Sequence, residues 1–191
     1  MSLTRERVPE LERKSVQVLQ ECDAFIVPVD LDKVCAAHRV KVHMEPLEDN
    51  VSGVLIIKGG ERHALINAAH HTNRQRFSLA HEIGHLLLHD NRGDRLFIDT
   101  RMRVYQRAGA PHDDVYTNAH ATTKPHEEAE ANMFASALLM PKPLLEKAAK
   151  GLDLEEEAGI ATLARMFAVS DQAMSIRLQQ LNLVTVLTFD N

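Results

Sequence analysis

The sequence predicts an α+β domain with a small antiparallel or mixed sheet, followed by a helical C-terminal appendage. Most strand candidates lie together between residues 39 and 67, and helical patterns precede and follow them. We expect the main domain to span residues 1–150 and the appendage residues 151–191. A chain of 191 residues is long enough to bury a sizeable core.

The first part of the chain predicts two helices and three strands. Residues 3–24 have an amphipathic helical pattern, and a second, short helix is expected after Pro28-Val29-Asp30. Alternating polar and apolar residues then predict a strand over residues 39–44. Two further strands, over 52–58 and 62–67, flank Gly59-Gly60, a dipeptide suited to a hairpin turn.

A long helix is expected next, over residues 72–89, where Thr72 to Gln75 has the pattern of a capping box. Apolar residues lie around most of its circumference, which predicts a buried core helix. Inside it, His81-Glu82-Ile83-Gly84-His85 has the H-E-x-x-H spacing of zinc peptidases. Two histidines and a glutamate in a core are costly unless something satisfies them, and a metal ion would do so.

This spacing suits metal-dependent hydrolysis for a geometric reason. Residues four apart share one helix face about 6 Å apart along the axis, so His81 and His85 can bind one ion. Glu82 is rotated by about 100° from His81 and can act as a general base without binding the metal. His89 lies about 12 Å from His81 along the axis, which is too far for a shared ion.

A catalytic zinc site needs a third protein ligand, and here it must come from another helix. The helix expected over residues 125–140 carries three acids near its start: Glu127, Glu128 and Glu130. We favour Glu128, because Asn132 follows four residues later on the same face and could hold a metal-bound histidine in place. Glu127 and Glu130 remain alternatives.

The segment between these two helices gives weaker indications. Leu96-Phe97-Ile98 indicates a short strand, and the rest of residues 91–124 has an irregular pattern with an arginine bias. The bias fits either a solvated face or contact with a substrate. Five residues could stabilise a developing oxyanion, and the sequence does not choose among Tyr105, Tyr116, His112, His120 and His126.

Bulk properties exclude several classes of protein. A formal net charge of −5 and a pI near 6.1 argue against nonspecific nucleic-acid binding by the whole chain. No apolar run has the length of a membrane span, and charged residues occupy the N-terminal region where a signal peptide would be apolar. Cys22 and Cys35 are expected to be free thiols in a reducing compartment. We therefore expect a cytoplasmic protein.

The C-terminal appendage has the layout of a helix-turn-helix. One helix is expected to begin near a capping-box pattern at Asp153 to Glu156, and a serine-capped second helix to begin after Ala168-Val169-Ser170. Residues 151–191 contain two arginines against six acidic residues, a formal charge of −4. Because DNA binding needs a basic footprint, we expect packing or partner docking rather than direct DNA binding.

The motifs in combination resemble the ImmA/IrrE family of intracellular metallopeptidases. The resemblance rests on Arg76 to His85, on Glu128-Ala129-Glu130-Ala131-Asn132-Met133-Phe134-Ala135 and on Leu138-Leu139-Met140-Pro141. It extends upstream through Val51-Ser52-Gly53-Val54 and covers about residues 28–145.

This resemblance implies a zincin-like fold, a Zn²⁺ ion bound by His81, His85 and Glu128, and Glu82 as the catalytic base. It further implies an endopeptidase that cleaves a helix-turn-helix repressor of the Cro/C1 type, which would make the protein an anti-repressor in transcription regulation. The alternative from another functional class is a non-enzymatic, metal-containing regulator that binds a repressor or DNA.

Overall fold

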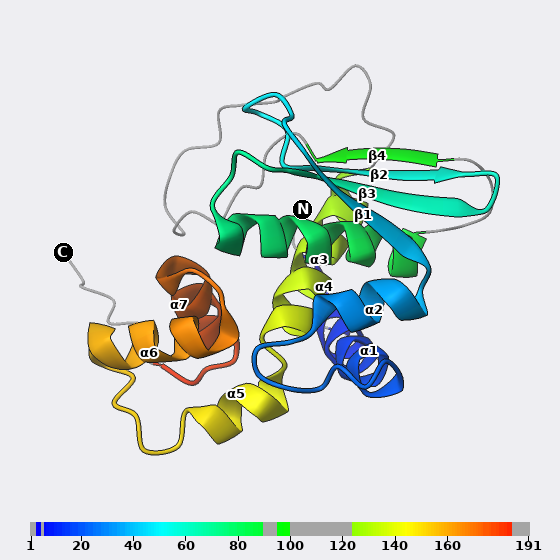
Figure 1. Cartoon of the computed structure of the whole chain (residues 1–191). Coiled ribbons are helices and arrows are strands. Elements are labelled where there is room, and N and C mark those ends of the chain that lie inside the picture. Colours follow the sequence, from blue (N-terminus) through cyan, green and yellow to red (C-terminus); the bar gives the residue numbers. More distant parts are fainter. Residues whose placement is uncertain (1–2, 5, 90–94, 100–123, 185–191) are drawn as a thin grey trace.

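The computed structural model describes residues 3–4, 6–89, 95–99 and 124–184. Within this part, helices and strands follow one another as α1 (Arg7–Glu21), α2 (Leu31–Ala37), β1 (Val40–Glu45), β2 (Gly53–Lys58), β3 (Glu61–Asn67), α3 (Thr72–His89), β4 (Arg95–Asp99), α4 (Pro125–Leu139), α5 (Lys142–Ala148), α6 (Glu157–Phe167) and α7 (Asp171–Gln180). Figure 1 shows the sheet on one side of α3 and the helices α1, α2 and α4 on the other. The predicted α+β class is confirmed.

The sheet is mixed, with the strand order β1-β3-β2-β4. Strands β2 and β3 form the predicted hairpin, in which Gly59 and Gly60 have φ values of 59° and 83°. These positive values explain why the turn contains glycines. Strand β1 pairs with β3 in parallel, and β4 pairs antiparallel with β2. The interior strand β2 is therefore fixed from both sides.

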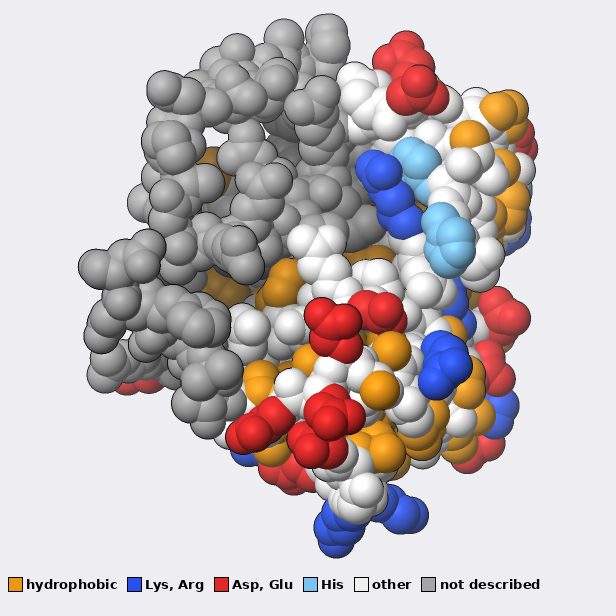
Figure 2. Space-filling view, turned by 90° about the vertical axis from the view of Figure 1, so that its left-hand side faces the viewer, with side chains coloured by type: hydrophobic (Ala, Val, Ile, Leu, Met, Phe, Trp, Pro, Cys, Tyr) orange, Lys and Arg blue, Asp and Glu red, His pale blue; other side chains and the backbone are white. Residues whose placement is uncertain are grey.

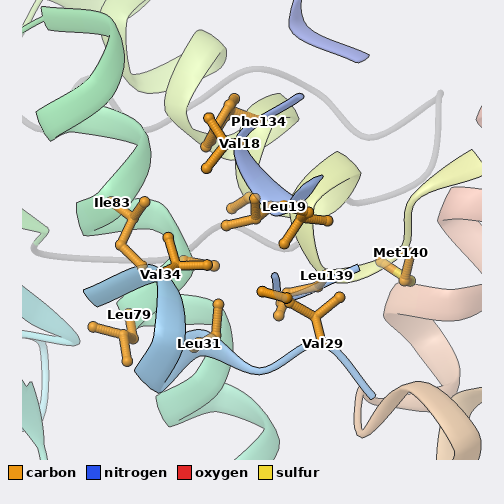
Figure 3. Close-up of a cluster of buried hydrophobic side chains, with 14 of the residues drawn as sticks. Val18, Leu19, Val29, Leu31, Val34, Leu79, Ile83, Phe134, Leu139 and Met140 are labelled. Atoms are coloured by element: carbon orange, nitrogen blue, oxygen red, sulfur yellow. The ribbon is translucent and has the colours of Figure 1, made fainter. Parts of the chain in front are cut away.

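Helix α3 covers one face of this sheet, as its apolar circumference predicts. All residues from Ser78 to Leu86 are buried. The sheet contributes a matching set of buried apolar side chains: Leu55, Ile57, Ala64, Ile66 and Phe97. The same core continues on the other side of α3, where Figure 3 shows Leu79 and Ile83 among side chains from α1, α2 and α4.

Helix α4 approaches α3 closely because small residues line the contact. A Cβ atom added to Gly84 would lie 3.2 Å from both the Cα and the carbonyl oxygen of Ala131. Side chains that small allow two helix backbones to come nearer than larger residues would. This crossing brings the first turns of α4 alongside the second half of α3.

The C-terminal helices pack onto the same core. Leu163 and Phe167 of α6 and Leu178 of α7 belong to one continuous cluster of buried apolar residues with the preceding helices. Arg177 of α7 is 0% exposed. Its guanidinium donates to the Glu12 carboxylate of α1 at 2.5 and 2.8 Å and to the Met140 carbonyl at 3.1 Å. How the chain divides into domains stays a prediction.

Two helix starts differ from the sequence prediction. At the start of α3 the ring Nδ1 of His71 accepts from the Asn73 amide at 3.2 Å, and the Gln75 side chain donates to the preceding loop, 2.7 Å from the His70 carbonyl oxygen. The Gln75 side chain therefore bonds to the loop before the helix and does not complete the expected capping box. Helix α6 begins at Glu157, later than the pattern at Asp153 indicated.

Two other helix starts agree with the sequence prediction. The short helix expected after Pro28-Val29-Asp30 is α2, and Asp30 caps it by accepting from the amides of Asp32 and Lys33. The predicted serine cap also forms, since the Ser170 hydroxyl accepts from the Ala173 amide at the start of α7. Both cysteines are free thiols. Among the described helices, none combines the length and apolar character needed to cross a membrane.

Candidate metal centre

Helices α3 and α4 bring two histidines and a glutamate together at their crossing. His81 and His85 lie one helical turn apart, and their Nε2 atoms are 2.9 Å from each other. The Glu128 carboxylate of α4 reaches both rings, with Oε2 3.3 Å from His81 Nε2 and Oε1 3.2 Å from His85 Nε2. Among the described residues, His81, His85 and Glu128 form the one group of three side chains that could hold a metal ion.

The separations and donor types of this cluster fit a divalent metal ion. Ligand atoms on one tetrahedral zinc ion, at bond lengths of about 2.0–2.2 Å, lie about 3.3–3.6 Å apart. The two Nε2 atoms are 2.9 Å apart, and each faces a different oxygen of the Glu128 carboxylate, at 3.3 Å for His81 and 3.2 Å for His85. Two imidazole nitrogens and one carboxylate oxygen are also the donor set of known catalytic zinc sites, which keep a fourth position open. The residues present therefore suit such an ion.

Asn132 sets the protonation pattern of one histidine. Its Oδ1 atom lies 3.1 Å from Nδ1 of His81 and accepts the hydrogen that this nitrogen carries. Because Nδ1 keeps its hydrogen in this bond, Nε2 is the atom that gives up its hydrogen and offers a lone pair when an ion binds, which is the tautomer a metal ligand requires. Asn132 was expected to contact a histidine of the site because it lies four residues after Glu128 on the same helix face, and it contacts His81. The role of Asn132 in metal binding stays a prediction.

The three acids at the start of α4 have separate partners. Glu127 accepts from the Lys124 backbone amide at 3.0 Å and so caps its own helix. Glu130 forms a two-pronged ion pair with Arg7 of α1, at 2.8 and 2.9 Å. Glu128 alone among the three faces the histidine pair. Packing thus distinguishes acids that sequence spacing left as alternatives.

His89 lies beyond the cluster, as its distance along the helix predicted. Its Nε2 atom donates to the backbone carbonyl of Glu127 at 3.1 Å, which ties the end of α3 to the first turn of α4. Burial, aided by the nearby His85, lowers the pKa of His89. A neutral ring that donates from Nε2 suits this structural contact.

The surroundings of Glu128 favour its ionised form. Burial alone would raise the pKa of this carboxyl, but hydrogen bonding and charge interaction with His81 and His85 outweigh burial and lower the pKa below its usual range. Its side chain remains 32% exposed, whereas both histidine side chains are 2% exposed. The cluster is therefore open on the side of the carboxylate.

Glu82 and two neighbours complete the site. The Glu82 side chain is 0% exposed and lies against Gly53 at the start of β2, where an added Cβ would be 2.7 Å from Oε1. The Phe97 ring of β4 stacks on His85, with ring centroids 4.9 Å apart. Sequence reasoning assigned no role to Gly53 or Phe97. A glycine within a strand pattern does indicate a close approach to the backbone, so Gly53 could have been noticed.

One of the five candidates for stabilising an oxyanion lies among the described residues. Tyr105, Tyr116, His112 and His120 lie outside the described residues, as does nearly all of the arginine-biased stretch. His126 is described and is exposed in the first turn of α4. The choice among these residues stays open.

Comparison with known proteins identifies the family to which this chain belongs. A search of curated proteins finds no significant match. The family model for peptidase M78, described as the IrrE N-terminal-like domain, matches residues 35–179, well over half of the chain. The match extends further toward the C-terminus than the resemblance noted in the sequence, because it includes α6 and most of α7. The chain therefore belongs to the ImmA/IrrE family of peptidases, which suggests that it is a metallopeptidase.

Proposed function

We propose that this protein is a zinc-dependent endopeptidase in which His81, His85 and Glu128 bind the metal and Glu82 is the general base. The observation that carries the proposal is the convergence of these three ligand atoms, all within 4.8 Å of one another, beside a buried glutamate. Membership of a peptidase family supports the same assignment. A bound zinc ion would polarise the scissile carbonyl and lower the pKa of a water molecule.

The residues of the chain divide the remaining work. Glu82 accepts a proton from the attacking water, whose oxygen bonds to the carbonyl carbon of the peptide. When the carbon–nitrogen bond breaks, Glu82 returns the proton to the leaving amine. Asn132 holds His81 in the tautomer whose Nε2 can bind the ion. The two histidines are buried and held by packing, which keeps them in place throughout.

The substrate class that we propose is a helix-turn-helix repressor, acted on in the cytoplasm. This follows from the resemblance of the motifs to the ImmA/IrrE family, whose members are known for cleaving such repressors. The open side of the cluster at Glu128 is compatible with access by a protein chain. Direct DNA binding is not part of this proposal.

A comparison of two variants tests the mechanism. Purified wild type, Glu82→Gln and His81→Ala are loaded with zinc and incubated with a repressor encoded next to the gene. Cleavage is followed by mass spectrometry and zinc by elemental analysis. Glu82→Gln should keep its zinc and lose cleavage by about 10²–10⁴-fold, because it keeps the shape and removes the base. His81→Ala should lose both.

Undiminished cleavage by zinc-loaded Glu82→Gln would contradict this mechanism. A wild-type protein that binds the repressor tightly and never cleaves it would instead favour the non-enzymatic regulator.

A further inference from the structure

Gly53 lies directly against the carboxylate of Glu82. A Cβ atom built on Gly53 would meet three atoms of that side chain, Oε1 at 2.7 Å, Cγ at 3.3 Å and Cδ at 3.4 Å. The first distance is shorter than real Cβ contacts, the second is tight, and the third is at the lower limit of ordinary contact. Glu82 can occupy its position only because residue 53 has no side chain.

The backbone at Gly53 has little freedom to retreat. Gly53 begins the interior strand β2, where it is paired with Ile66 of β3 and Asp99 of β4. The two preceding residues are held as well, since Asn67 donates from Nδ2 to the Val51 carbonyl at 2.8 Å and from its amide to the Ser52 carbonyl at 3.1 Å. A side chain at position 53 would therefore displace Glu82 rather than the strand.

Backbone conformation does not explain the glycine. The glycines with positive φ are Gly59, Gly60 and Gly151 among the described residues, and Gly53 is not one of them. Any residue could adopt this conformation, and a glycine inside a strand loses more conformational entropy on folding than other residues do. Space for the Glu82 carboxylate is the reason that the structure offers.

We infer that Gly53 is a positioning residue for Glu82, and that the missing side chain sets where the base can lie. The inference rests on the proposed function in that it treats Glu82 as the base. Under this inference, the two tightly packed glycines of the site, Gly53 and Gly84, have different roles. Gly53 controls the position of Glu82, whereas Gly84 controls the distance between α3 and α4 through Ala131.

The two Gly→Ala variants should therefore fail in different ways. Gly53→Ala displaces the base and leaves His81, His85 and Glu128 in place, so zinc affinity should be unchanged. Gly84→Ala pushes against the backbone of α4, which carries Glu128, so zinc affinity should fall. Competition with a chromogenic chelator measures both, and Gly84→Ala is the matched control for Gly53→Ala.

A double-mutant cycle tests the contact without zinc or substrate. Denaturant unfolding of the zinc-free protein is measured for wild type, Gly53→Ala, Glu82→Ala and the double variant. In the presence of Glu82, Gly53→Ala should raise the unfolding equilibrium constant about tenfold. In the Glu82→Ala background the same change should have no unfavourable effect, because the clash is gone. Additive effects would overturn the inference.

Turnover of the repressor then separates positioning from packing. Gly53→Ala should lower kcat by about 10²-fold with KM within about twofold of wild type, because a small misplacement of a catalytic group is costly. In the Glu82→Gln background it should cause no further loss. Unchanged kcat, or a loss that appears in zinc affinity instead, would refute the positioning role. If the wild type cleaves nothing, the proposed function fails, while the unfolding cycle still decides the Gly53–Glu82 contact.

Discussion

Two helix pairs of this molecule bury charged or ionisable side chains, and they do so in opposite ways. In the pair α3–α4, the ligand atoms of His81, His85 and Glu128 point at one another within 4.8 Å. In the pair α6–α7, the buried charge is Arg177, and its guanidinium is bonded to a carboxylate and a carbonyl of other elements. Both arrangements are costly to bury.

The difference shows how to tell a functional buried group from a structural one. Arg177 is 0% exposed and its donors are directed to Glu12 and Met140, so the fold itself completes its bonding. The α3–α4 cluster instead gathers three groups that suit one ion, and its carboxylate is 32% exposed. Convergence of ligand atoms on an accessible point indicates binding, whereas burial with protein partners indicates packing.

The largest expected effect concerns the third ligand of the α3–α4 cluster. Glu128→Ala should weaken zinc binding by more than the roughly 10–100-fold that loss of a supporting outer residue costs. Asn132→Ala, which removes such a supporting contact, should fall within that range. Chelator competition measures the zinc affinity of both variants, and circular dichroism checks that they are folded.

His89→Ala is the control for this series, because His89 bonds to the Glu127 backbone and not to the cluster. It should keep a near-normal zinc content. Equal zinc loss in folded Glu128→Ala and folded His89→Ala would remove the assignment of Glu128.

The second expected effect is on stability, at the buried arginine of the α6–α7 pair. Glu12→Ala leaves the buried Arg177 without its carboxylate, which should lower the free energy of unfolding by about 3–5 kcal/mol. Chemical denaturation of the zinc-free protein measures this cost. The control on the same helix is Glu10→Ala, since Glu10 is exposed in its ion pair with Arg7 and should cost no more than about 1 kcal/mol. Similar losses in both variants would contradict the structural role of Arg177.

The smallest effect is expected for DNA binding by the α6–α7 pair. Burial of Arg177 leaves Arg165 as the exposed arginine of this unit, beside exposed acids at its start. Figure 2, viewed from this side, shows acidic side chains gathered on the described surface. Duplex DNA should bind no more tightly than about 10⁻⁶ M at physiological salt, as measured by fluorescence anisotropy. A nanomolar site with a steep salt dependence would contradict this expectation.

Local sequence patterns determined much of the candidate site. Helix geometry fixes what residues four apart can share, so the spacing of His81 and His85 predicted their convergence, and the longer separation of His89 excluded it. The same four-residue spacing predicted that Glu128 and Asn132 lie on one face of the second helix. The hairpin at Gly59-Gly60 and the serine cap at Ser170 are local for the same reason, since a few neighbouring residues define each turn or cap.

Contacts between distant segments were decided only by the tertiary structure. From the residues alone, Glu127, Glu128 and Glu130 are neighbours of equal chemistry, and what separates them is that α1 supplies Arg7 to Glu130 while α3 presents two histidines to Glu128. The parallel pairing of β1 with β3, the use of His71 at the start of α3 and the close fit of Gly53 against Glu82 likewise depend on how segments pack. A periodic pattern describes one helix or strand at a time, whereas these features depend on contacts between two elements that are distant in the sequence.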